Sequence, residues 1–153
     1  MLSHELTLGR SIGVILQPGD DVLRSIVDAC ILHRVRQGYV PVFLGAFRSV
    51  RLIATTAGLL DPEPPLADAV DVAYTEGIGN GSFSWDESTG EPHVHLHVSV
   101  GVKEQGGLAY AGHLLAATTH YTAELVIQEV LSPTMARVSD PAAFGLENLV
   151  FTA

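Results

Sequence analysis

Three of the chain's seven histidines alternate with apolar residues in the stretch Pro92-His93-Val94-His95-Leu96-His97-Val98-Ser99-Val100. Successive side chains of a β-strand point to opposite faces. The stretch therefore predicts a strand with one apolar face packed on a core. Its other face would carry a row of imidazoles, and clustered imidazoles are a common means of holding a metal ion.

A fourth histidine follows in the stretch Ala111-Gly112-His113-Leu114. Residues 103–107 between the two stretches are typical of a tight turn, since Gly106 and Gly107 can adopt positive φ. A hairpin centred on Gln105 puts His97 directly opposite His113 and His95 on the diagonal. Opposed Cβ atoms lie about 5 Å apart and diagonal ones about 7–8 Å. A register shift of one residue would instead turn His113 to the other face.

With this register, His95, His97 and His113 are the predicted ligands of Zn²⁺ or a similar divalent metal. Three imidazoles leave one tetrahedral position open, as in catalytic rather than structural zinc sites. An ion of this kind can polarise a carbonyl group or activate a water molecule. His93 is further from His113 and is expected beside the ligands or simply exposed, and His120 would join only if the chain folds back. The alternative interpretation is a sheet face whose polar residues meet solvent or another surface.

Glu124 is the carboxylate that we single out as a candidate general acid or base, because it follows the histidine hairpin closely. Its alternative interpretation is an exposed strand glutamate. The sequence contains no nucleophile elbow, phosphate-binding loop or HExxH motif. The histidines are thus the main chemical signal.

Composition limits the class of protein. A chain of 153 residues suits a single domain over residues 1–153. The hydrophobic content of 47% favours a compact protein. Because only 16% of the residues are charged, part of the surface is expected to be buried in an oligomer. A net charge of −9 with one lysine disfavours nucleic acid as a partner. The start of the chain lacks signal-peptide features and no apolar run is long enough to span a bilayer, which predicts a cytoplasmic protein without membrane contact. Cys30 is the only cysteine, which excludes an intrachain disulfide and a thiolate metal cluster.

The pattern along the first half predicts one dominant helix among strands. A strand over residues 10–17 ends at the turn Pro18-Gly19-Asp20, and Asp20 is expected to cap a helix that Gly38 closes. Cys30 lies on the apolar stripe of this helix and is expected to be buried. Two β-like runs follow, over residues 39–47 and 50–57, and Pro41 favours an edge strand or a strand start.

The second half predicts mostly strands. The expected elements are a loop over residues 58–69, a strand at 70–74, bulges or turns at Gly77, Gly79 and Gly81, a short strand at Phe83 and Trp85, a turn at 86–90 and a final strand at 149–151. Residues 121–130 fit a short helix or a strand, and their β-branched content favours a strand. The fold class is therefore α/β of the α+β type, mostly β with one main helix.

Several stretches together resemble the prokaryotic branch of the PPC domain (plants and prokaryotes conserved domain). These are Pro92–Val100, Ala111–Leu115, Thr122–Ile127, Gly19–Leu23, Gly45–Arg51, Arg137–Asp140 and Gly145–Leu149, so that the resemblance covers about residues 8–153. It implies a curved, largely antiparallel sheet, a homotrimer, and a fold related to acetolactate decarboxylase, a zinc enzyme with a histidine triad. It also implies that His95, His97 and His113 bind a zinc-like ion.

The chain departs from the family pattern in two respects. Ala111 replaces the first glycine of the usual Gly-Gly-His-Leu motif, and the Arg-Gly-Arg-Pro core of the AT-hook found in nuclear plant members is absent. The histidine set and the resemblance lead to two hypotheses for the function, the first based on the three histidines and the second on the plant members of the family. One is a trimeric metal-binding protein with a small-molecule pocket, as in a metal-dependent lyase or hydrolase-like enzyme acting on a carbonyl or carboxylate compound. The other is a non-enzymatic, DNA-associated regulator or scaffold.

Overall fold

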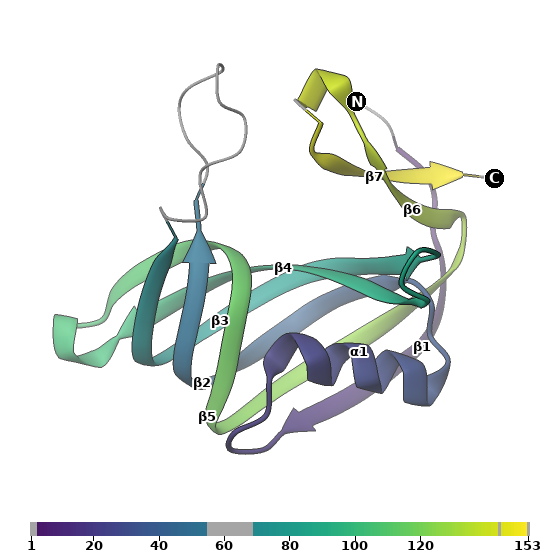
Figure 1. Cartoon of the computed structure of the whole chain (residues 1–153). Helices are drawn as coiled ribbons and strands as arrows, with labels where there is room; N and C mark the ends of the chain where they lie inside the picture. Colours follow the sequence, from purple (N-terminus) through teal and green to yellow (C-terminus); the bar gives the residue numbers. More distant parts are fainter. Residues whose placement is uncertain (1–2, 55–68, 144, 153) are drawn as a thin grey trace.

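The computed structural model describes residues 3–54, 69–143 and 145–152. Within these ranges the chain forms strands, one α-helix and two short 3₁₀ turns (Figure 1). The elements are β1 (Thr7–Leu16), α1 (Val22–His33), β2 (Gly38–Ile53), β3 (Val70–Asp86), β4 (Glu91–Val102), η2 (Lys103–Gln105), β5 (Leu108–Ser132), β6 (Thr134–Ser139), η3 (Pro141–Ala143) and β7 (Glu147–Thr152).

Five strands form one antiparallel sheet in the order β1-β5-β2-β3-β4. β4 also pairs with β5, so the sheet curls into a small barrel-like shape, and α1 covers one side of it (Figure 1). β6 and β7 form a separate two-stranded hairpin on the side away from α1. The predicted curved, largely antiparallel sheet with one main helix is confirmed.

The core lies between α1 and the curled sheet. Val22, Ile26 and Cys30 on the inner side of the helix are fully buried, which confirms the expected burial of Cys30. Ile31, predicted on the same apolar stripe, is 43% exposed. The three buried side chains meet side chains of β2, β3, β4 and β5 in one cluster that includes Phe43 and Leu96. Full burial of an aliphatic or aromatic side chain contributes about 1.5–3 kcal/mol, so this cluster is the main source of stability.

The ends of α1 differ from the prediction. Asp21 is the N-cap, and its Oδ1 accepts a hydrogen bond from the backbone N–H of Arg24 at 2.8 Å. Asp20, the predicted cap, lies one residue before the N-cap and instead accepts from the N–H of Gln17 at 2.8 Å. The helix ends at His33, since Arg34 adopts the left-handed conformation (φ 55°) and closes the last turn, so Gly38 does not close it.

β2 is one continuous strand rather than the two predicted runs. It lies between β5 and β3, so the prediction of an edge strand at Pro41 is wrong. Register shifts fall between Val40 and Phe43 on the β3 side and between Tyr39 and Val42 on the β5 side. Pro41 lacks a backbone N–H, and a local irregularity lets an interior strand accommodate it. Residues 55–57 of the second predicted run lie outside the described residues.

β3 is likewise one strand, and its glycines are not bulges or turns. Gly77, Gly79 and Gly81 pair in regular register with Val100, Val98 and Leu96 of β4. A Cβ at Gly81 would collide with the carbonyl oxygen of His95, so glycine allows close approach of β4. The predicted loop over residues 58–69 lies outside the described residues except for Ala69.

One long strand of the C-terminal half, β5, was predicted as two separate strands, one around His113 and one at residues 121–130. β5 is 25 residues long and includes residues 121–130, which confirms a strand there. The predicted final strand at 149–151 is confirmed within β7, while its partner β6 was not predicted. Among the described residues, no helix is long and apolar enough to cross a membrane.

Candidate metal centre

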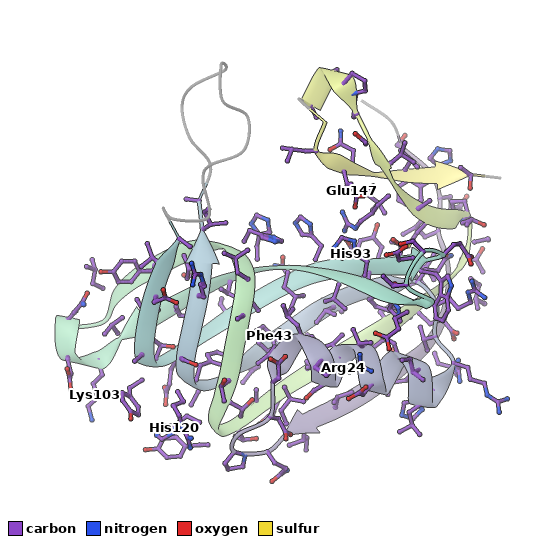
Figure 2. The ribbon with its side chains drawn as sticks, in the orientation of Figure 1. Arg24, Phe43, His93, Lys103, His120 and Glu147 are labelled. Atoms are coloured by element: carbon purple, nitrogen blue, oxygen red, sulfur yellow. The ribbon has the colours of Figure 1, made fainter. Side chains whose placement is uncertain are left out.

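The hairpin of β4 and β5 has the predicted register. His97 pairs directly with His113, and the turn between the strands carries Gly106 (φ 68°) and Gly107 (φ 82°) in left-handed conformations. Leu96 and Val98, on either side of His97, are buried in the core. The histidines therefore point to the other side of the sheet, away from α1, where Figure 2 shows imidazoles above β4.

Three of the imidazoles converge. One ligand atom from each of His95, His97 and His113 lies within 4.8 Å of the other two. The Nε2 atoms of His95 and His97 are 3.1 Å apart, and these two rings are stacked with centroids 5.1 Å apart. The ring of His113 lies edge-on to both, at 4.6 Å from His95 and 5.6 Å from His97. These are the three residues that the sequence predicts as ligands.

The environment keeps two of these imidazoles neutral. Burial, reinforced by the charge of Arg137, lowers the pKa of His95 to about 4. Burial and then neighbouring His97 lower the pKa of His113. Neutral imidazole is the form that coordinates a metal. His95 and His113 are therefore in the form that coordinates a metal at neutral pH.

The donor set fits a zinc-like ion. Zn–N bonds of 2.0–2.1 Å in a tetrahedron keep neighbouring nitrogens about 3.3–3.4 Å apart, close to the 3.1 Å between His95 and His97. Nδ1 of His113 is buried and has no hydrogen-bond partner among the described residues. A buried polar atom of this kind normally has a partner.

The other two histidines considered in the sequence lie outside this cluster. The exposed side chain of His93 has Nδ1 3.6 Å from Oε2 of Glu147 on β7. His120 lies inside β5 rather than beyond the second hairpin strand, because β5 continues to Ser132. Its ring packs against Tyr74 and Tyr121, far from the His93 region in Figure 2.

Glu124 also lies outside the convergent group. It is exposed on β5, where it pairs with Ile15 of β1 on one side and Leu44 of β2 on the other. The pairing continues from Leu44 to Ile78 of β3. Glu124 thus stands in a transverse row of exposed apolar side chains, and its role as a general acid or base stays a prediction.

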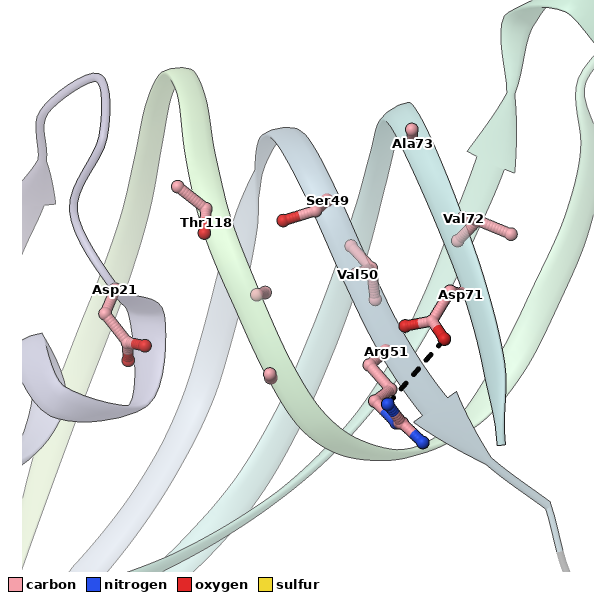
Figure 3. A pocket seen from close by; sticks show the side chains of 10 residues that line it. Asp21, Ser49, Val50, Arg51, Asp71, Val72, Ala73 and Thr118 are labelled. Carbon is pink, nitrogen blue, oxygen red and sulfur yellow. Dashed lines mark ion pairs between the residues drawn. The ribbon is translucent and has the colours of Figure 1, made fainter. Parts of the chain in front are cut away.

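An open hollow of about 470 Å³ adjoins the histidines, a size that suits a small ligand. It is lined by Tyr39, Val40, Pro41, Asn80, Gly81, Ser82, His95 and His97. A second hollow, of about 310 Å³, lies elsewhere on the sheet near the start of α1 (Figure 3). It contains the Arg51–Asp71 ion pair, with nitrogen and oxygen 3.8 Å apart, and no histidine lines it.

Arg137 is the site residue that the sequence reasoning missed. It lies on β6, and its Nη2 donates to Oγ of Ser82 at 2.8 Å. Ser82 is the direct partner of His95 across β3 and β4. Arg137 falls in the stretch Arg137–Asp140 that contributes to the family resemblance, but nothing in this stretch indicates a place at the site, since the contact with Ser82 on β3 is what brings it there.

Fold and site together define a small α+β protein with a curled antiparallel sheet and a three-histidine cluster on its open side. The family model of the Plants and Prokaryotes Conserved (PCC) domain matches residues 3–131. The chain belongs to this family, which confirms the resemblance seen in the sequence. No curated protein matches the chain.

Three solved structures share the fold. A metal-containing protein from Archaeoglobus fulgidus has a TM-score of 0.78 at 21% identity, covering 98% of this chain and 99% of that one. A PPC protein from Pyrococcus horikoshii has a TM-score of 0.77 at 22% identity, covering 97% of each chain. A candidate DNA-binding protein from Ralstonia eutropha JMP134 has a TM-score of 0.73 at 19% identity, covering 92% of this chain and 90% of that one.

The expected relation to acetolactate decarboxylase has a counterpart among these structures. A Staphylococcus aureus protein similar to α-acetolactate decarboxylase has a TM-score of 0.50 at 18% identity. The match covers 82% of this chain and 53% of that one. It is a similarity of fold.

Proposed function

We propose that this protein binds Zn²⁺ or a similar divalent ion through His95, His97 and His113, and that the adjoining hollow admits a small molecule. The observation that carries the proposal is the convergence of three imidazoles, with ligand atoms within 4.8 Å of one another. The metal-containing neighbour from Archaeoglobus fulgidus supports it.

The proposed chemistry is that of a metal-dependent lyase or hydrolase-like enzyme on a carbonyl or carboxylate compound. When bound, an ion with three protein ligands supplies Lewis-acid character at its open position. The chain's own contribution is to keep His95 neutral, to hold the three rings in place by the β4–β5 ladder, and to shape the hollow with Asn80 and Ser82.

Metal analysis of the full chain, purified without a histidine tag, tests the proposal. We expect about one divalent ion per chain, and loss of that ion in the double variant His97→Ala/His113→Ala. His120→Ala is the matched control, because His120 lies on the same strand outside the cluster. Absence of stoichiometric metal, or retention of it by the double variant, would contradict the proposal.

We also propose that the protein is a homotrimer, as the family resemblance implies. Ile15, Leu44 and Ile78, here called the apolar row, are 66%, 42% and 66% exposed. They are cross-strand neighbours in one row across the sheet, which is apolar except for the exposed Glu124 between Ile15 and Leu44. Exposed apolar strips of this kind mark association surfaces.

A role as a DNA-associated regulator or scaffold is the second candidate. Two proteins of the same fold are candidate DNA-binding proteins, the one from Ralstonia eutropha and a second from Bacteroides thetaiotaomicron, which weighs against dismissing nucleic acid as a partner. Against it, Arg10, Arg24 and Arg36 are each paired with carboxylates, which reduces their charge toward phosphates. A mobility-shift titration over a range of salt concentrations decides: specific binding at physiological salt supports the second candidate, and no binding removes it.

A further inference from the structure

Arg137 lies beside the histidine cluster although β6 is remote from β4 in the sequence. Its Nη2 donates to Oγ of Ser82, which faces His95 directly across β3 and β4. Opposed side chains in a sheet have Cβ atoms about 5 Å apart, so the guanidinium lies next to the imidazole of His95. Its positive charge contributes to the lowered pKa of both His95 and His113, which is consistent with a position near both rings.

The guanidinium of Arg137 has one hydrogen-bond donor that is unpaired among the described residues. Its Nε is buried and has no hydrogen-bond partner among the described residues. Burial lowers the pKa of Arg137, but an arginine keeps its charge at physiological pH. A buried cationic donor is normally paired, and a carboxylate or phosphate is the acceptor that matches its planar fork.

Glu147 is the carboxylate that β7 brings near this group. Its charge acts to raise the pKa of Arg137, yet its Oε2 lies 3.6 Å from Nδ1 of His93, and its side chain is half exposed (Figure 2). Nε of Arg137 stays unpartnered beside it. Glu147 therefore partly offsets the positive charge of Arg137 but does not accept a hydrogen bond from its Nε.

Arg137 is not among the lining residues of the hollow beside β4, but it contacts the wall of that hollow through Ser82. Ser82, His95 and His97 all line it, and Ser82 is the residue that Arg137 contacts. Asn80, the cross-strand partner of His97, adds a polar group to the same wall. A small molecule in this hollow would lie against the histidine cluster and next to the guanidinium.

We propose that Arg137 is the anion-recognising residue of this site, and that its ligand is a small organic carboxylate that also offers an oxygen to the metal. The inference rests on the proposed function, because it places the second oxygen of the ligand at a bound ion. It narrows the proposed carbonyl or carboxylate compounds to small carboxylates and adds a specificity residue on the separate β6–β7 hairpin.

Charge favours a carboxylate over a phosphate. One guanidinium with Glu147 close by suits a monoanion, whereas sites for phosphate dianions usually combine several donors or a helix N-terminus. The described residues that line the hollow include no arginine and no lysine, so Arg137 behind Ser82 is the cation placed next to it. The overall charge of −9 also disfavours a ligand with several negative charges.

Titration of the Co²⁺-loaded full chain with glycolate, glycolamide and inorganic phosphate tests this inference, with the visible Co²⁺ spectrum as readout. We expect glycolate to bind and to change the spectrum, and its neutral amide to bind at least tenfold more weakly. In Arg137→Gln, glycolate affinity should fall at least tenfold while Co²⁺ affinity is retained. The preference for glycolate over glycolamide should vanish in this variant, which a purely structural role would not cause.

Two further variants sharpen the test. Arg36→Gln is the matched control, because Arg36 stacks on Trp85 with its Cζ 4.2 Å from the ring centroid and pairs with Glu87, outside the hollow. Arg137→Lys keeps the positive charge but lacks the planar guanidinium that pairs with a carboxylate through two N–H groups. This variant should recover part of the glycolate affinity that Arg137→Gln loses. Glycolate affinity in Arg137→Gln within twofold of the wild type would overturn the inference, and so would phosphate binding that is tighter than glycolate binding.

If the wild-type chain takes up no Co²⁺, the proposed metal-binding function fails. This outcome is distinct from a failure of the inference about Arg137. In that case calorimetric titration of the metal-free protein with glycolate decides the role of Arg137 alone. Binding that falls at least tenfold in Arg137→Gln keeps the anion site. Equal binding by both proteins, or binding by neither, overturns it.

Discussion

His97 on β4 and His113 on β5 are direct cross-strand partners. The turn at Gly106 and Gly107 fixes this register, so the pairing of the two imidazoles is a property of the hairpin itself. His95 joins them from the next position on the same face of β4. Its Nε2 lies 3.1 Å from that of His97. The histidine cluster therefore depends on the β4–β5 hairpin, while Arg137, the proposed anion-binding residue, lies on the β6–β7 hairpin.

The close approach of β3 and β4 should make Gly81 intolerant of a side chain. A Cβ at Gly81 would meet the carbonyl oxygen of His95 and the side chain of Leu96, so Gly81→Ala should lower the free energy of unfolding by about 1–3 kcal/mol. Gly13→Ala is the control, because nothing lies within 4 Å of its added Cβ. Urea denaturation measures both. Equal stability of the two variants would contradict the packing described for β3.

The metal-free protein should lose stability on mild acidification. Burial lowers the pKa of folded His95 to about 4 from an unfolded value of about 6.5, so the unfolded chain binds more protons between these values. This part of the stability is complete above about pH 6.5 and is lost as the pH falls toward 4. Thermal unfolding from pH 7.5 to 4 should show a smaller decrease for His95→Asn than for the wild type. An identical pH dependence would show that His95 is not the responsible group.

A charge placed in the apolar row should dissociate the proposed trimer. Ile78 is 66% exposed and lies in this row, so Ile78→Lys should bring a charge into the interface and yield monomers. Leu32→Lys is the control, because Leu32 is 77% exposed on α1. Light scattering after size-exclusion chromatography gives the mass of each variant. A monomeric wild type, or a trimeric Ile78→Lys, would contradict this assignment of the interface.

The N-cap assignment predicts a local effect on α1. Asp21→Ala removes the acceptor for the N–H of Arg24 and should cost about 0.5–2 kcal/mol of stability. Asp21→Asn keeps a capping oxygen and should recover most of this loss. Chemical denaturation of the two variants is the measurement, and a loss of equal size in both would argue that the charge, not the cap, is what matters.

The hairpin and its three histidines could be predicted from the sequence because the information is local. Alternation defines the face of β4, and the glycines at 106 and 107 define the turn, so the pairing of His97 with His113 follows from short-range rules. The stripe of α1 is equally local. Its ends were misplaced by one residue at Asp20 and by several at Gly38, since competing polar groups near a helix end are hard to rank without the contacts.

The remaining features depend on tertiary packing. Gly77, Gly79 and Gly81 resemble turn residues, and only the pairing of β3 with β4 shows that they allow a close approach. Pro41 suggests an edge because the irregularity that accommodates it is invisible in the sequence. The position of Arg137 beside the histidines could not be predicted, although the residue lies in a stretch that carries the family resemblance, because β6 was not predicted and the contact with Ser82 joins residues distant in the chain.

X-ray absorption at the zinc K-edge tests the central claim most directly. The full chain, purified without a histidine tag and loaded with one equivalent of zinc, should show three imidazole ligands at about 2.0–2.1 Å and one oxygen ligand from solvent or a small molecule. His120→Ala should give the same spectrum, and His97→Ala/His113→Ala should lose it. A zinc environment with fewer than three imidazoles, or one unchanged in the double variant, would contradict the account.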